Sequence, residues 1–205
     1  SEASLSQDEL MNRVSQADAM MAFMPDKVDE SFLRACPNLR VIGAALKGYD
    51  NFDVKACQDS GVWFTVVPDL LTVPTAELTI ALMTGLMRNV LAADSYVRSG
   101  QFSGWRPTFY GMGIAGSTVG IIGMGAIGKA ITERLAGWGA ELLYTDQSRL
   151  SEDYETALGL AFVELEDLLK RSDVVILALA LNDETYHLIS NEQLSVMKQG
   201  AYVIN

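Results

Sequence analysis

The stretch Val119-Gly120-Ile121-Ile122-Gly123-Met124-Gly125-Ala126-Ile127-Gly128 decides the fold of this chain. It joins an apolar, strand-like run to a G-x-G-x-x-G turn that opens a helix. In such a turn Gly123 permits the tight bend, Gly125 lets the backbone approach a pyrophosphate, and Gly128 lets the helix pack closely on the strand. Backbone N–H groups and the helix dipole would then bind the diphosphate. The hexapeptide alone is weak evidence, but its strand–turn–helix context predicts a dinucleotide site.

A carboxylate stands where such a site needs one. The next expected strand, Leu142–Thr145, ends at Asp146, 23 residues after Gly123. An acidic residue there accepts hydrogen bonds from the adenosine ribose and repels a 2′-phosphate, which favours NAD over NADP. The alternative is an ordinary turn and a solvated aspartate, which the ordered arrangement disfavours. Arg149 could soften the preference for NAD, but we expect it at the surface.

Short β-type runs alternate with helical stretches on both sides of this motif. That pattern predicts an α/β fold in which helices cover parallel sheets. We expect two Rossmann-like lobes, both incomplete: a substrate-binding lobe over residues 1–70 and an NAD-binding domain over 71–205. The expected strands are Ala19–Phe23, Leu39–Leu46, Val62–Val67, Thr118–Ile122, Leu142–Thr145, Val174–Leu179 and the final run Ala201–Ile204.

A long helix is expected from Pro74 to about Val97. Its i+4 repeat predicts a buried stripe, made of Leu78, Leu82, Leu86 and Val90. The glycine- and aromatic-rich segment Ser99–Gly116 that follows indicates an extended loop or arm.

Composition narrows the function classes. The 205 residues are 49% hydrophobic, carry a formal net charge of −11 and hold only two cysteines. A surface that acidic disfavours nucleic acid and anionic lipid as partners. No apolar run reaches the ~20 residues of a membrane span. Cys36 and Cys57 lack metal-ligand spacing and are too few for a disulfide framework, so we expect no metal, and reduced thiols in a cytoplasmic protein.

Both ends of the chain look cut. It opens at Ser1 rather than Met, without an export leader, and it stops at Asn205 directly after a strand-like run. We therefore expect a fragment, truncated at its C-terminus.

Lys47 is the candidate anion-binding residue. It is a cation at the end of an apolar strand in an acidic protein, where it could draw a small oxyanion. The alternative, a solvated lysine paired with Asp50 or Asp53, is equally compatible with the residues alone. We expect Asp53 to cap the next helix. His187, the only histidine, is expected to be exposed and inert.

These motifs resemble the NAD-dependent D-2-hydroxyacid dehydrogenases over nearly the whole chain. The resemblance rests on Gly48-Tyr49-Asp50-Asn51, Thr75-Ala76-Glu77, the glycine turn and Val203-Ile204-Asn205. Within the family, Met20–Asp26, Ala45–Gly48 and Val67–Leu78 are most similar to members that oxidise phosphite. Lys47 and Asp69 are specific to that likeness, since other members usually carry a small or apolar residue and a glycine there.

The resemblance implies oxidation of phosphite to phosphate with NAD as the cofactor. Lys47 would hold the phosphite anion. The resemblance therefore favours an anion-binding role for Lys47 over a solvated lysine paired with an aspartate. The substrate pocket would be lined or approached by Met24, Leu71, Trp105 and Tyr110. The cofactor would further be contacted by Thr75, Ala126, Ile127, Ala178, Leu179, Ala180 and Asn205. The family commonly has proline where Ala180 stands, which puts the shape of that turn in doubt.

Other family residues have no counterpart here. An arginine, a glutamate and the histidine that acts as general acid–base follow the Asn205 position in the family. We therefore expect no turnover from this chain alone. The arm Ser99–Gly116 would pack across a two-fold axis, as in relatives, to form a homodimer; a flexible surface loop is the alternative.

Two other functions stay open. In a 2-hydroxyacid or glyoxylate-type reductase, Lys47 would hold a carboxylate instead of phosphite. An NAD-sensing interaction protein of the same fold is less favoured, because an acidic surface with an anion site gives it no support.

Overall fold

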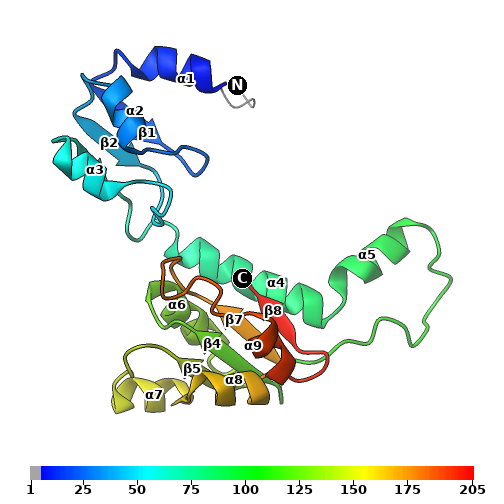
Figure 1. Cartoon of the computed structure of the whole chain (residues 1–205). Coiled ribbons are helices and arrows are strands. Elements are labelled where there is room, and N and C mark those ends of the chain that lie inside the picture. Colours follow the sequence, from blue (N-terminus) through cyan, green and yellow to red (C-terminus); the bar gives the residue numbers. More distant parts are fainter. Residues whose placement is uncertain (1–5) are drawn as a thin grey trace. The chain divides into compact units, whose positions relative to one another are not determined.

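A computed structural model describes residues 6–205 of the chain. The chain divides into two compact units, Ser1–Leu71 and Thr72–Asn205 (Figure 1). Both units contain a parallel sheet accompanied by helices, which confirms the predicted α/β class.

The first unit holds a three-stranded parallel sheet in the order β1-β2-β3. Aspartates fix where two of its helices begin: Asp29 accepts a hydrogen bond from Phe32 N at 3.0 Å and Asp53 accepts one from Ala56 N at 2.8 Å. Strands and helices share one apolar cluster, which includes the fully buried Ile42. The elements are α1 (Gln7–Val14), β1 (Ala19–Ala22), α2 (Glu30–Ala35), β2 (Val41–Ala44), α3 (Val54–Asp59) and β3 (Trp63–Thr65).

The second unit holds a five-stranded parallel sheet in the order β6-β5-β4-β7-β8. Within this sheet the chain forms the central strand β4 first and adds β5 and β6 on one side of it. The chain then crosses back and adds β7 and β8 on the other side. In such sheets ligands bind at the carboxyl ends of the strands where the order reverses, which here is the end of β4. The elements are α4 (Thr72–Met87), α5 (Val90–Arg98), β4 (Thr118–Ile122), α6 (Ala126–Leu135), β5 (Glu141–Thr145), α7 (Glu152–Leu158), β6 (Leu160–Phe162), α8 (Leu165–Arg171), β7 (Val174–Leu177), α9 (Asn191–Val196) and β8 (Tyr202–Ile204).

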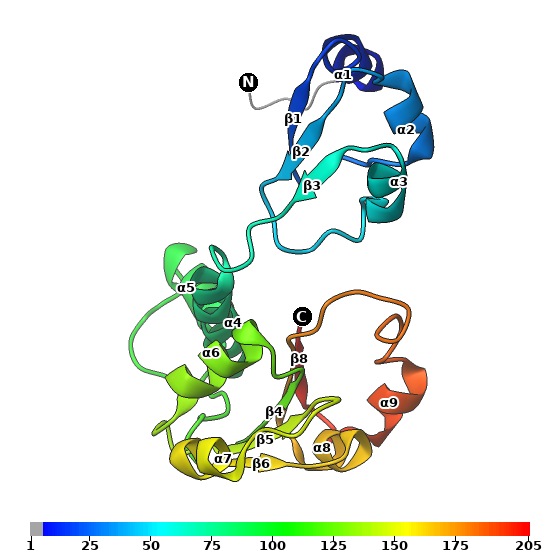
Figure 2. The same ribbon diagram turned by 90° about the vertical axis from the view of Figure 1, so that its left-hand side faces the viewer.

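Alternate side chains of β4 face two apolar layers. Ile121 joins the cluster that contains Met83 of α4 and Ile131 of α6, whereas Ile122 joins the cluster that contains Leu168 of α8. Figure 2 shows α6 and α8 on opposite sides of the strands. The sheet is therefore covered on both faces, as its continuous apolar strands require.

The long helix differs from the expectation in two ways. It is broken into α4 and α5, which meet at an angle of 66°, and Asn89 between them has a left-handed φ of 53°. The predicted buried stripe is wrong: Leu78, Leu82, Leu86 and Val90 are 59%, 46%, 45% and 49% exposed. The helix is apolar on more than one face, and the face that packs on the domain core carries Ala76, Met83 and Met87.

Two elements, α7 and β6, are absent from the elements expected from the sequence. Helix α7 begins at the Ser151 cap and β6 pairs with β5 at the edge of the sheet. The segment between Arg98 and Thr118 forms no helix or strand, so the expected irregular arm is confirmed.

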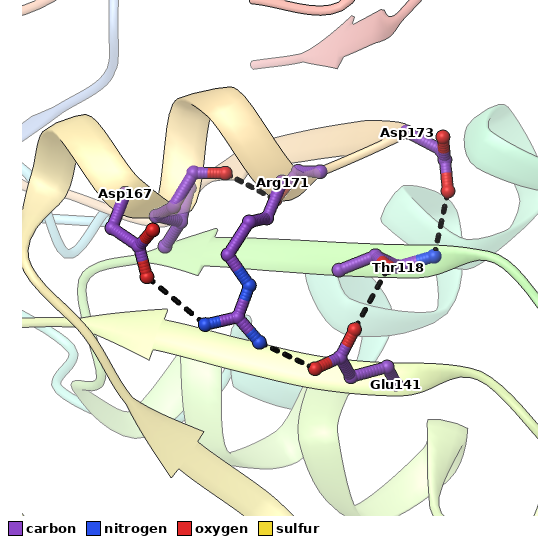
Figure 3. Close-up of polar contacts among 7 residues, drawn as sticks. Thr118, Glu141, Asp167, Arg171 and Asp173 are labelled. Atoms are coloured by element: carbon purple, nitrogen blue, oxygen red, sulfur yellow. Dashed lines mark hydrogen bonds and ion pairs between the residues drawn. The ribbon is translucent and has the colours of Figure 1, made fainter.

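The edge of the sheet opposite the glycine turn is joined by polar side chains (Figure 3). Asp173 accepts a hydrogen bond from Thr118 N at 2.8 Å and pairs with Lys198 at 2.8 Å. Arg171 bridges Asp167 of its own helix, at 2.9 Å, and Glu141 of β5, at 2.6 Å. These contacts tie α8 to the first residue of β5, and the residue before β7 to the first residue of β4 and to the turn after α9.

Within residues 6–205, no individual helix has the length and apolar character needed to cross a membrane. Taken together, the bent pair α4 and α5 meets those two criteria, although three α4 side chains are fully buried in the domain core.

Candidate functional site

The turn between β4 and α6 has the geometry that its glycines require. Gly123 has a φ of +94°, a conformation that side chains disfavour, and its N–H donates to Thr145 O at 2.9 Å. A Cβ on Gly128 would lie 2.2 Å from Gly123 O, so the helix approaches the turn as closely as glycine permits. Gly125 precedes α6 with open space around it and offers no side-chain cap. The N–H groups at the start of α6 are therefore available to a diphosphate.

Asp146 is held at the end of β5, beside this turn. One carboxylate oxygen accepts from Met124 N at 2.5 Å and the other accepts from Ser148 N at 3.2 Å. Two backbone donors thus fix the carboxylate where strand β5 meets the glycine turn. That position suits a contact with the ribose of a bound adenosine.

A cavity of about 280 Å³ opens at this edge of the sheet. Four of its lining residues were singled out from the sequence, namely Gly123, Asp146, Leu179 and Ala180. The others are Ile122, Thr145, Gln147, Leu165, Asn182, Glu184, Thr185 and Leu188. No residue on this described lining is cationic, whereas two are acidic.

Sequence reasoning missed the loop that forms one wall of the cavity. Gln147 Nε2 donates to Glu184 Oε2 at 2.6 Å, which joins the loop after β5 to the loop after β7. Thr185 Oγ1 donates to Ala180 O at 2.6 Å, so a hydroxyl group holds the turn after β7. Only the tertiary fold brings Gln147 and Glu184, 37 residues apart, together.

The remaining predicted cofactor residues also belong to the second unit. A Cβ on Gly123 would lie 2.6 Å from Ala178 O, so Ala178 borders the turn. Ala126 and Ile127 form the first residues of α6. Thr75 is exposed near the start of α4, and Asn205 is exposed just after β8. Their contacts with a cofactor stay predictions.

A buried polar cluster supports the loop that follows β5 and contains Asp146. Glu155 of α7 is 7% exposed and accepts a hydrogen bond from the Tyr144 hydroxyl at 2.7 Å. Arg149 donates to both oxygens of Glu155, at 3.0 Å and 2.8 Å. The Arg149 guanidinium, together with that hydroxyl, lowers the pKa of Glu155 from 4.5 to about 2. Burial, with the Glu155 hydrogen bond, raises the pKa of Tyr144.

Lys47 lies in the first unit, shortly after β2, and is partly buried. No other residue in the range 6–205 forms an ion pair with it, so the pairing with Asp50 or Asp53 that we considered is not found. Asp53 instead caps α3, as expected. Within residues 6–71, no ion pair therefore neutralises the lysine.

The predicted substrate-pocket residues are exposed and belong to both units. Met24 is 69% and Leu71 44% exposed in the first unit; Trp105 is 76% and Tyr110 75% exposed in the arm of the second. Asn51 Nδ2 donates to Met24 O at 3.2 Å and to Asp26 O at 2.5 Å, which anchors the loop that carries Met24. A pocket shared by these residues stays a prediction.

No group of three metal-ligating side chains is assembled within the part of the chain that the structure describes. His187 is exposed, as expected, and its ring stacks on Tyr186 at 4.0 Å.

Comparison with known proteins agrees with this geometry. Residues 80–205 match the family described as D-isomer specific 2-hydroxyacid dehydrogenase, NAD binding domain. A protein of Korarchaeum cryptofilum named glyoxylate reductase is 41% identical, and the match covers 100% of this chain and 62% of that protein.

Two solved structures extend the likeness to both units. The TT0316 protein from Thermus thermophilus is similar with a TM-score of 0.91 and 33% identity, over 98% of this chain and 63% of that one. A D-lactate dehydrogenase from Aquifex aeolicus, complexed with NAD and lactic acid, has a TM-score of 0.85 and 30% identity, over 95% and 58%. The chain therefore spans about three fifths of the length of these relatives.

Proposed function

Since the chain belongs to the D-isomer specific 2-hydroxyacid dehydrogenase family, we propose that the whole protein is an NAD-dependent dehydrogenase of a small 2-hydroxyacid or its oxo form, of the glyoxylate type. The observation that carries the proposal is the edge of the second sheet, where Gly123 of the glycine turn and Asp146 line one cavity and where the glycine turn leads into α6. The glyoxylate reductase relatives supply the substrate class.

The residues at this edge fit the cofactor NAD. There is no room for a side chain at Gly128, whereas the space around Gly125, in front of the helix, is open. The Asp146 carboxylate is fixed in a position that suits a hydrogen bond from the ribose. When bound, NAD accepts or donates a hydride. The residues of this chain would bind the diphosphate and the adenosine and fix the cofactor's orientation.

Lys47 supplies the expected site for the anionic group of the substrate. The protein has a formal net charge of −11, so a small anion needs a local cation to bind. An ammonium group without an ion-pair partner among the described residues of its own unit meets that need. For glyoxylate or a 2-hydroxyacid it would hold the carboxylate.

Phosphite is a second candidate substrate, favoured by a specific observation. Lys47 and Asp69, with the stretches Met20–Asp26 and Val67–Leu78 around them, resemble phosphite-oxidising members of the family. The reaction would convert phosphite, NAD⁺ and water to phosphate, NADH and a proton. Lys47 would then hold the phosphite anion.

One experiment separates these candidates. The protein encoded by the complete reading frame is assayed for NADH oxidation with glyoxylate, and for NAD⁺ reduction with phosphite and a panel of 2-hydroxyacids. Turnover of glyoxylate or a 2-hydroxyacid without turnover of phosphite supports the first candidate, and the reverse supports the second. Absence of NAD binding would refute both candidate functions. Residues 1–205 span about three fifths of the relatives' length, and we expect them alone to bind NAD without turnover.

We also propose that two copies associate through the second unit. Four leucines are exposed on α4 and α5, and large exposed apolar patches mark interaction surfaces; they are Leu78, Leu82, Leu86 and Leu91. The arm leaves this region and is anchored by Asn89, which donates to Phe109 O at 3.4 Å.

Location in the cytoplasm stays a proposal; the buried, unpaired thiols of Cys36 and Cys57 agree with it.

A further inference from the structure

Arg149 carries a guanidinium group, which NADP sites use to bind phosphate. The lining of the cofactor cavity, however, carries acidic residues. Arg149 follows Asp146 by three residues, a span of at most about 11 Å of chain. In dinucleotide-binding domains an arginine near this position accommodates the 2′-phosphate of NADP. Whether the domain rejects that phosphate therefore depends on where the guanidinium is held.

The structure holds the guanidinium away from such a role. Arg149 makes a bidentate pair with Glu155, and its charged end lies 5.9 Å from the centre of the Phe162 ring. A fork-to-fork pair of this kind is geometrically specific and stronger than a single hydrogen bond. The Nε and Nη2 donors, which form one edge of the guanidinium, are both occupied by Glu155.

Glu155 is itself fixed in place. It is buried and accepts the Tyr144 hydroxyl, and that hydroxyl in turn accepts Leu150 N at 2.7 Å. If Arg149 turned outward to a phosphate, the Glu155 carboxylate would stay buried without a cationic partner. Leaving a buried charge unpaired is strongly unfavourable.

We propose that Glu155 is a specificity-determining positioning residue, which keeps Arg149 from the adenosine ribose and so favours NAD over NADP. Asp146 and Glu184 then remain as the charged groups on the described lining of the cavity, and both repel a 2′-phosphate. The inference rests on the cofactor site and is independent of which substrate the whole protein uses.

The test compares NAD⁺ and NADP⁺ binding to residues 1–205 by isothermal titration calorimetry. Glu155→Gln removes the charge but keeps the shape of the side chain. We expect it to tighten NADP⁺ binding by roughly tenfold, the value of one charge-assisted hydrogen bond, and to change NAD⁺ binding by less than about threefold. The double variant E155Q/R149Q should lose the gain, because the released guanidinium is then absent.

Each outcome bears on the proposal. An unchanged preference between the cofactors in E155Q would overturn it, as would a gain that survives in E155Q/R149Q, since removal of negative charge alone would then explain it. Circular dichroism verifies that E155Q is folded.

A second set of variants leaves Glu155 untouched. In an Asp146→Ser background, which relieves the repulsion, adding Arg149→Gln should change NADP⁺ binding and NAD⁺ binding by the same factor, to within about twofold, if Glu155 holds the guanidinium away from the phosphate. A loss of NADP⁺ affinity that exceeds the loss of NAD⁺ affinity on adding R149Q would show that Arg149 already reaches the phosphate, and would overturn the inference even if E155Q did not fold. The fragments 2′,5′-ADP and 5′-AMP, titrated in parallel, confine the comparison to the adenosine end.

Discussion

At the scale of single residues, Gly128 and Gly125 play different parts in the same turn. An added Cβ at Gly128 would lie 2.2 Å from a backbone oxygen, whereas at Gly125 nothing lies within 4 Å. Gly128→Ala should lower the free energy of unfolding by about 3 kcal/mol, the upper end for overpacking, and abolish NAD binding.

Gly125→Ala is the matched control. It should cost at most about 1 kcal/mol of stability, the loss of glycine before a helix, and should mainly weaken binding of the diphosphate. Urea unfolding and NAD titration check both variants. Equal stability of the two would contradict the close packing of α6 on the turn.

The Glu155 carboxylate predicts a pH dependence of stability. Its pKa is lowered from 4.5 to about 2 in the folded protein, first by Arg149 and then by Tyr144, so the ionised form favours folding. That contribution is fully present above pH 4.5 and is lost as the pH falls through about 2. The stability gap between the parent chain and E155Q should therefore narrow from about pH 6 to about pH 3.

Urea unfolding at several pH values measures the gap. Glu152→Gln, an exposed change on the same helix, should stay within about 0.5 kcal/mol of the parent throughout. A gap for E155Q that is constant down to the lowest pH would show that the pair contributes no pH dependence.

At the scale of elements, the contacts of Asp173 and of Arg171 should contribute unequally to the stability of the second unit. Both lie at the edge of the sheet opposite the glycine turn (Figure 3). The Asp173 side chain is 20% exposed and accepts Thr118 N, so Asp173→Ala leaves a backbone donor unpaired and should cost about 1–3 kcal/mol. The Arg171 side chain is 42% exposed, so Arg171→Ala should cost less than about 1 kcal/mol and less still at high salt. Thermal unfolding at low and high salt distinguishes them, and the opposite ranking would refute the argument from burial.

Most strands and the glycine turn could be located from the sequence because these signals are local. Strand β7 and residues 119–122 of β4 have no polar side chain, and Gly123 and Gly128 have no substitute in this turn. The buried face of α4 could not be chosen in this way, because Leu82 and Met83 are both apolar and only the partner helix α6 decides between them.

Tertiary contacts explain what else was missed. Strand β6 has three residues and a single neighbouring strand, so its pattern is too short to detect. Arg149 was expected at the surface, and its side chain is indeed 57% exposed, but the pair with Glu155 depends on how α7 returns to β5. Gln147 and Glu184 meet only because two strand ends share one edge.

At the scale of the whole molecule, the exposed face of α4 predicts the oligomeric state. Leu82 is 46% exposed in the middle of an apolar row, which is costly in water and is relieved if a second copy covers it. Leu82→Glu should convert a dimer to a monomer, because a carboxylate would be buried without a partner at the interface.

Leu194→Glu provides the control, since Leu194 is 49% exposed on α9 and belongs to a different surface. Light scattering coupled to size exclusion should give a dimer for the parent and for L194E, and a monomer for L82E. NAD titration shows that both variants keep the cofactor site, which separates loss of assembly from loss of folding. A monomeric parent, or a dimer that survives in L82E, would mean that this face is not the contact between copies, and the row of leucines would then need another partner.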